Sequence, residues 1–206
     1  MPKIFDSETR EDIRSQMLEN GYSLIKRFGL KKTTIEDVTR SSGVAKGTFY
    51  NFFKTKEEFI YQIVIHKRRQ IHERSMEMIS ANGGAVDRRM LRGLLRLVIN
   101  GDYSLLTYLS RDDIAVLAAR WPKGYMENAY DDEKMFSLIY DKVTRRSSEC
   151  DWKVFINLYK IAVLGLSERE RLNADTLGET VTLLIESMLD YVFDDSHIKL
   201  AAAAIS

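Results

Sequence analysis

The chain has 206 residues, of which 45% are hydrophobic and 30% charged, a composition typical of a soluble globular protein. Only 2 prolines and 11 glycines favour long helices over many short strands. No segment approaches the roughly 18 apolar residues of a membrane span, and the charged N-terminus lacks the apolar core of a secretory signal. The single cysteine, Cys150, excludes an intramolecular disulfide framework and favours a reducing, cytoplasmic setting.

The net charge of +1 conceals an uneven distribution. Residues 1–70 hold 14 Lys/Arg against 9 Asp/Glu, whereas the remainder holds 17 against 21. A basic N-terminal third is compatible with nucleic-acid binding, although helix faces often carry such an excess.

Two helices are predicted at the start of the chain. Apolar residues fall on one broad face over residues 7–26, and the following Gly29 is typical of a helix C-terminus. Thr34 can cap a second helix whose first turn is acidic, as the helix dipole favours. This second helix is expected to end near Ser41, before a turn that contains Gly43.

Further helices follow in quick succession. A third short helix is expected over residues 45–52, and Thr55 with Glu58 predicts a capping box that opens a long fourth helix to about residue 80. Asn82-Gly83-Gly84 is the clearest linker. Later helical stretches are expected near residues 86–100, 102–120, 123–146, 151–167 and 174–193. Since no strand alternation is visible, the predicted fold is all-α.

Residues 34–52 contain two short helices joined by a tight turn, which is a helix-turn-helix. In this arrangement the second helix enters the major groove of DNA. Lys46 supplies positive charge for the phosphate backbone, and Gly47 allows close approach. The Thr48 hydroxyl can meet a base or phosphate, and the Asn51 amide matches adenine N6 and N7. Phosphate contacts are also expected from Tyr50, Lys54 and Lys56. The same shape occurs in proteins that bind no DNA.

A series of short motifs resembles the N-terminal signature of the TetR (tetracycline repressor) family. The motifs are FGL at 28–30, TTIEDV at 33–38 and GVAKGTFYNFFKTKEEF at 43–59. The match covers about residues 10–60, and the remainder agrees with the family only in length and helical character. By this resemblance the DNA contacts are Thr34, Lys46, Thr48, Tyr50, Asn51, Lys54 and Lys56. Ala45 departs from the serine that commonly caps the third helix, and Asn51 from a common histidine, so the base preference is expected to differ.

The resemblance implies an all-α fold of about nine helices in two domains. A three-helix DNA-binding head with the helix-turn-helix would occupy residues 1–54, and a helical effector-binding and dimerisation body residues 55–198. Residues 199–206 look like a vector-derived tail. The implied function is a transcriptional regulator, expected to be a repressor, that binds an inverted-repeat operator as a homodimer and is released by a small-molecule effector.

The last two helices are the expected dimer interface. Residues 152–166 are apolar on almost every side, and residues 174–193 carry a broad apolar stripe. Family members usually pack these two helices against their partner copies as a four-helix bundle, although both helices would also suit the core of a monomer. Two heads spaced near 34–36 Å would reach successive major grooves, so an inverted repeat is the expected operator.

Aromatic residues are frequent in the middle of the chain, and aromatic walls with polar tips suit a small-molecule pocket. The same residues equally suit an ordinary core. The candidates for ligand binding are Tyr103, Tyr108, Trp121, Tyr125, Phe136, Tyr140, Phe155 and Tyr159.

The sequence also bears on three other kinds of protein. An enzyme is not expected, because the sequence offers no nucleophile–base pair, phosphate loop or metal-ligand spacing, and no cofactor is expected either. A regulator without any effector and a helical adaptor that acts through protein contacts alone both stay open.

Overall fold

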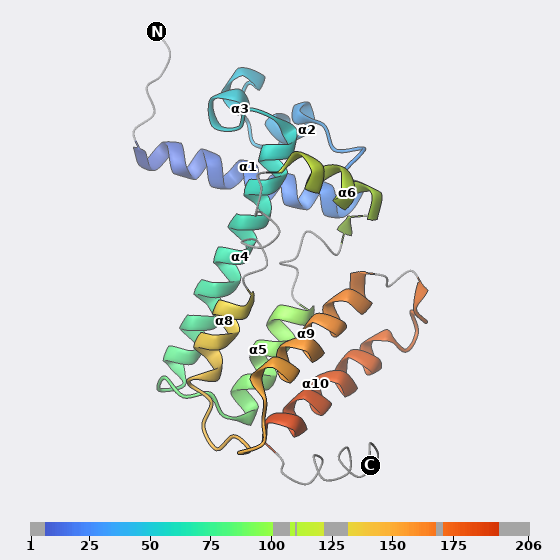
Figure 1. The fold of residues 1–206 in the computed structure, drawn as a ribbon. Coiled ribbons are helices and arrows are strands. Elements are labelled where there is room, and N and C mark those ends of the chain that lie inside the picture. Colours follow the sequence, from blue (N-terminus) through green and yellow to red (C-terminus); the bar gives the residue numbers. More distant parts are fainter. Residues whose placement is uncertain (1–6, 101–107, 110, 122–131, 168–170, 194–206) are drawn as a thin grey trace. The chain divides into compact units, whose positions relative to one another are not determined.

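The computed structural model describes residues 7–100, 108–109, 111–121, 132–167 and 171–193 (Figure 1). Their regular structure is helical, apart from one isolated bridge between Val86 and Val143. The predicted all-helical fold is therefore confirmed. None of the helices in these ranges is long and apolar enough to cross a membrane.

The chain divides into two compact units. The first comprises Met1–Gln70 and Tyr103–Ala129, and the second Ile71–Asp102 and Tyr130–Ser206. Helix α4 (Lys56–Ala81) belongs to both, because it begins in the first unit and ends in the second.

The first unit contains α1 (Ser7–Phe28), α2 (Ile35–Ser41), α3 (Lys46–Phe52), the beginning of α4, and α6 (Arg111–Arg120). The four helices predicted for residues 7–80 are all present. Gly29 ends α1 as expected: it adopts φ 82°, and its N–H donates to the carbonyl of Ile25 at 2.8 Å.

Close contact between α1 and α4 depends on Gly21. A Cβ atom at this position would lie 2.3 Å from Cζ of Phe59 and 3.1 Å from Cδ1 of Ile63, both on α4. The rest of this core consists of buried apolar side chains, chiefly Met17, Leu18, Tyr22, Ile25 and Ile60. The absence of a side chain at Gly21 therefore sets how closely the two helices pack.

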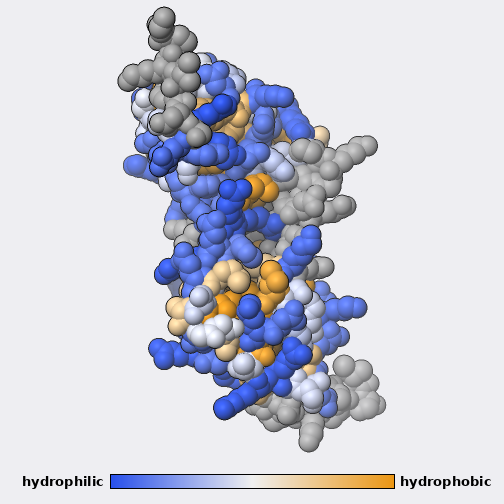
Figure 2. Space-filling model, turned by 90° about the vertical axis from the view of Figure 1, so that its left-hand side faces the viewer, coloured by the Kyte–Doolittle hydropathy of each residue, from blue (hydrophilic) through white to orange (hydrophobic). Residues whose placement is uncertain are grey.

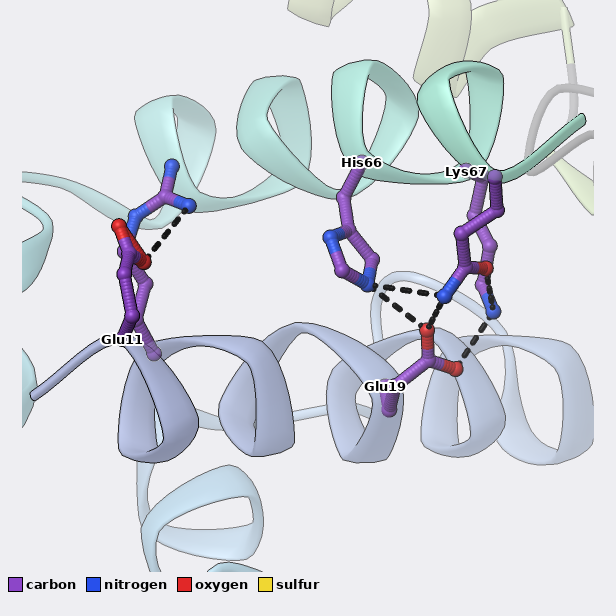
Figure 3. A network of polar contacts seen from close by, with 6 residues as sticks. Glu11, Glu19, His66 and Lys67 are labelled. Atoms are coloured by element: carbon purple, nitrogen blue, oxygen red, sulfur yellow. Dashed lines mark hydrogen bonds and ion pairs between the residues drawn. The ribbon is translucent and has the colours of Figure 1, made fainter. Parts of the chain in front are cut away.

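A polar network also joins α1 to α4 (Figure 3). The Glu19 carboxylate accepts hydrogen bonds from Lys67 Nζ at 2.5 Å and Gln70 Nε2 at 2.7 Å, and lies 2.8 Å from His66 Nε2. Lys67 is buried, and its ammonium lies 4.5 Å from the ring centroid of Tyr22. Burial acts to raise the pKa of Glu19, but the hydrogen bonds from Lys67 and Gln70 outweigh it, so the pKa lies below its ordinary value.

The second unit contains the end of α4 with α5 (Arg88–Asn100), α8 (Asp132–Tyr140), α9 (Trp152–Ser167) and α10 (Leu177–Phe193). Helices α5 and α9 both contact α10 (Figure 1). Arg92 of α5 donates two hydrogen bonds to the Glu186 carboxylate of α10, at 2.6 and 2.8 Å. Arg88, one turn before Arg92 in α5, forms an ion pair with Asp190, one turn after Glu186 in α10.

Two of the predicted helices are too long. Tyr108 and Leu109 lie outside an α-helix, and α6 begins at Arg111, so the prediction of one helix over 102–120 is wrong at its start. The prediction for 123–146 is wrong at its end, because α8 stops at Tyr140. The chain there pairs with Val86 instead, whose N–H donates to the Lys142 carbonyl at 2.8 Å. A helical pattern in sequence does not report such a distant backbone partner.

We expect Gly21→Ala to lower the free energy of unfolding by about 1–3 kcal/mol, because the added methyl group must displace the Phe59 ring. Urea unfolding followed by circular dichroism measures the change. Gly47→Ala is the control, since a Cβ there meets nothing within 4 Å and alanine is the better helix former. Equal stability of wild type and Gly21→Ala would show that the contact between α1 and α4 can accommodate a methyl group at position 21.

We expect Glu19→Gln to lower the free energy of unfolding at pH 7 by about 1–3 kcal/mol, because buried Lys67 loses its counter-charge. The lowered pKa of Glu19 stabilises the fold above the unfolded value of about 4.3. The difference between variant and wild type should therefore shrink as the pH falls below about 4.

The matched control is Glu11→Gln, which removes an exposed carboxylate 3.8 Å from Arg14 on the same helix. It should change the free energy by no more than about 0.5 kcal/mol. Equal effects of the two substitutions would contradict a special role for Glu19.

Candidate nucleic-acid interface

Thr34 caps α2, as the sequence predicts. Its hydroxyl accepts a hydrogen bond from the backbone N–H of Asp37 at 3.1 Å and donates one to the Asp37 carboxylate at 2.7 Å. The Thr34 N–H completes a capping box by donating to the same carboxylate. These hydrogen bonds from Thr34 lower the pKa of Asp37. The Thr34 hydroxyl, a predicted DNA contact, is thus already engaged in capping α2.

The turn between α2 and α3 is held at two points. Gly43 adopts φ 65°, a conformation that suits glycine, and the Val44 N–H donates to the Thr39 carbonyl at 3.0 Å. Asn20 of α1 donates from Nδ2 to the Ser41 carbonyl and to Ser42 Oγ, both at 3.0 Å. Asn20 fixes the end of α2 on α1. This role of Asn20 is not predictable from the sequence, because nothing local distinguishes it from a solvated asparagine.

Helix α3 has one buried and one exposed side. Phe49 is fully buried, with ring centroids 5.3 Å from Phe53 and 5.1 Å from Phe59. Four predicted DNA contacts are exposed, and Thr48 is half-buried. The exposed four are Lys46, Gly47, Tyr50 and Asn51. Ala45 precedes the helix without a side-chain cap, as its departure from serine implied.

Lys54 and Lys56 lie on either side of the cap of α4. Thr55 Oγ1 accepts from the Glu58 N–H at 3.0 Å, while the Glu58 carboxylate accepts from the Lys54 N–H at 2.8 Å. Glu58 therefore reaches one residue further back than a standard capping box predicts. Lys54 is exposed. Lys56 is half-buried and donates to the Leu30 carbonyl at 2.9 Å, and burial lowers its pKa.

One ion pair crosses the helix-turn-helix. Lys46 Nζ of α3 bonds to the Glu36 carboxylate in the first turn of α2. The hydrogen bond from Lys46 lowers the pKa of Glu36, and the bond to Glu36 raises the pKa of Lys46. From sequence, Glu36 is predicted only as a partner of the helix dipole, because an ion pair between residues ten positions apart depends on the geometry of the turn.

Comparison with known proteins agrees with this geometry. Residues 17–63, which contain α2, the turn and α3, match the profile of the bacterial regulatory proteins of the tetR family. The helix-turn-helix segment of this chain is thus similar to that of the tetR family. The chain is 30% identical over 91 residues to the fatty acid metabolism regulator protein of Bacillus subtilis, which is 44% of each chain. It is 26% identical over 86 residues to the transcriptional repressor NemR of Escherichia coli, 42% of this chain and 43% of that one. The match thus spans less than half the length of these relatives.

Solved TetR-family structures extend the likeness in fold to both units. A regulator from Mesorhizobium loti superposes with a TM-score of 0.61 at 16% identity, covering 89% of this chain and 98% of that one. Reduced NemR of E. coli gives a TM-score of 0.57 at 16% identity, covering 88% and 97%. At this identity the likeness concerns the fold alone.

Helix α6 is held against the first turn of α4. Arg120 forms an ion pair with Glu57, and the Trp121 indole N–H donates to the Glu57 carbonyl at 3.2 Å. Trp121 also lies 6.4 Å from the Tyr61 ring. Trp121, a predicted ligand contact, therefore takes part in packing within the first unit.

The remaining predicted ligand contacts fall into three groups. Tyr108 lies in the first unit, 6.3 Å from the Tyr22 ring. Phe136, Tyr140, Phe155 and Tyr159 form an aromatic cluster with Trp152 in the second unit. Tyr103 and Tyr125 lie outside the described residues. A cavity beside Tyr140 and Phe155 measures about 10 Å³, room for one water molecule.

The described ranges place no group of three or more His, Cys, Asp or Glu residues together where a metal ion could be held. Cys150 is buried beneath Tyr140, whose hydroxyl donates to the Cys150 carbonyl at 3.0 Å. Burial raises the pKa of the Cys150 thiol.

Proposed function

We propose that this chain is a transcriptional repressor that binds an inverted-repeat operator as a homodimer and is released by a small-molecule effector. The observation that carries the proposal is α3, which buries Phe49 and exposes Lys46, Gly47, Tyr50 and Asn51 on a helix-turn-helix. These exposed groups suit base edges and phosphates. NemR and other matched relatives are named as repressors, which supports that direction of regulation.

Tyr50 favours a nucleic acid over a protein as the partner of α3. Its ring is 48% exposed and packs edge-on against Phe49 at 5.5 Å, so the ring is held while the hydroxyl end stays accessible. Tyrosine also anchors protein interfaces, where it lies in a well-packed, desolvated surrounding. Here the other exposed residues of α3 are polar or glycine, which suits a DNA groove better than an adaptor surface.

The dimer is proposed to form through α9 and α10. Large apolar side chains stay exposed on both helices, among them Ile161 and Leu164 of α9 at 61% and 65%, and Leu183 of α10 at 62%. Ile161 and Val154 are seven residues apart, so they share one face of α9. Residues 152–166 are apolar on almost every side, and a partner copy would bury the face that a single chain leaves exposed. Figure 2 shows the side of the molecule on which α8, not α10, lies in Figure 1, and an apolar area over the second unit is visible there as well.

An effector is proposed to act through α4 and α6. Helix α4 is continuous from Lys56 to Ala81 and thus spans both units, and α6 holds its first turn through Glu57. A ligand that favours one arrangement of α6 would shift the start of α4, to which α3 is packed through Phe49 and Phe59. No described cavity beside the aromatic cluster admits such a ligand, so its binding would require the cluster to rearrange.

Selection from random duplex DNA should recover an inverted repeat with half-sites about one helical turn apart. Asn51→Ala should cost about 1–3 kcal/mol in affinity for this repeat and relax the preference at one position of each half-site. Fluorescence anisotropy measures the affinity. Asn173→Ala, the same change on an exposed residue of the second unit, should have no effect. Sequence-indifferent binding by the wild type would contradict the proposal.

Ile161→Glu should convert the dimer into a monomer, because a charge in the proposed interface would be buried without a partner. Sedimentation velocity at micromolar concentration distinguishes the two. Leu138→Glu on α8 is the control, since Leu138 is 48% exposed but lies on another helix. A monomeric wild type, or a dimer that survives Ile161→Glu, would disprove this interface.

A further inference from the structure

The charge on the exposed side of α3 is already neutralised within the chain. Lys46 is the one charged residue of the segment KGTFYNF, and its ammonium is bonded to Glu36 of α2. Both side chains remain about half exposed, at 54% and 52%. A cation that would be expected to attract phosphate is thus held by a carboxylate on the same surface.

Glu36 differs from its acidic neighbour in what it does. Asp37 caps α2 through Thr34 and lies 3.6 Å from Arg40, so α2 itself accounts for its charge. The Glu36 carboxylate instead reaches across the turn to α3. Its lowered pKa and the raised pKa of Lys46 agree that each partner keeps the other charged.

An exposed ion pair of this kind is weak, because water screens it. The phosphate backbone of a duplex is a strong competitor, since binding to it releases condensed counterions. A phosphate approaching Lys46 must nevertheless displace Glu36 or approach a pair that carries no net charge. Either course weakens the contact compared with a free ammonium group.

We propose that Glu36 competes with DNA phosphate for Lys46 and so weakens the sequence-independent part of DNA binding. The inference rests on the proposed function, in which α3 meets DNA. On unselected DNA the affinity comes almost entirely from phosphate contacts. At an operator the base contacts of residues such as Asn51 are added and do not involve Glu36. The loss of affinity at the Lys46 contact is therefore similar on both kinds of DNA, and it is the larger share of the binding free energy on unselected DNA.

The test compares wild type and Glu36→Gln on a mixed-sequence duplex of about 30 base pairs and on the selected inverted repeat, over a range of salt concentrations. Glu36→Gln should bind the mixed duplex at least about threefold more tightly at 0.1 M salt, and should gain a similar factor on the repeat. The slope of log K against log salt should become steeper by about 0.9 for each head, because one more phosphate is contacted.

Two controls separate competition for Lys46 from a general change of charge. Glu11→Gln removes the same charge from the same unit and should leave the slope unchanged. In a Lys46→Gln background, Glu36→Gln should no longer steepen the slope, because no ammonium is released. Thermal unfolding checks that each variant is folded.

An unchanged slope and affinity for Glu36→Gln would overturn the inference, and so would steepening that persists without Lys46. The wild-type preference for the repeat over the mixed duplex is measured in the same series. If that preference exists while Glu36→Gln behaves as wild type, the inference alone fails. If it is absent, the proposed function itself has failed.

Discussion

The burial of Phe49 against Phe53 and Phe59 is the contact on which the rest of the first unit depends. Helix α3 has seven residues, far fewer than an isolated helix needs to be stable in water. Its direction is therefore set by tertiary packing. The three rings are at most 2% exposed, and each contributes about 1.5–3 kcal/mol through its burial. Gly21 makes this possible, since Phe59 occupies the space that a side chain there would need.

Polar contacts select one arrangement of these helices among those that apolar packing alone would allow. Apolar packing alone tolerates small shifts of one helix along another, whereas a buried ammonium must stay within reach of its carboxylate. Lys67 and Glu19 therefore fix the register of α1 on α4, and Asn20 fixes the end of α2 one residue further along α1. Lys56 adds a third tie, to the loop that contains Leu30. Loss of any one of these three contacts would leave a polar group of the first unit without its hydrogen-bond partner.

The sequence predicts well those features that depend on neighbours in the chain. The cap at Thr34, the glycine stop after α1 and the two sides of α3 follow from residue type and spacing. Contacts between distant residues were not predictable in this way. Glu19 and Lys67 are 48 positions apart, and their pairing requires α1 and α4 to be side by side. The early end of α8 depends on Val86, which lies in a different segment altogether.

The two units expose surfaces of opposite character, and a dimeric repressor would need both. A single α3 contacts too few base pairs to find one site among many, so two heads must bind together. The apolar residues on α9 and α10 can supply the free energy of association without using any group that meets DNA. In such a dimer the proposed competition of Glu36 for Lys46 would act at both heads, so the factor by which it lowers the affinity for DNA at one head would enter as its square.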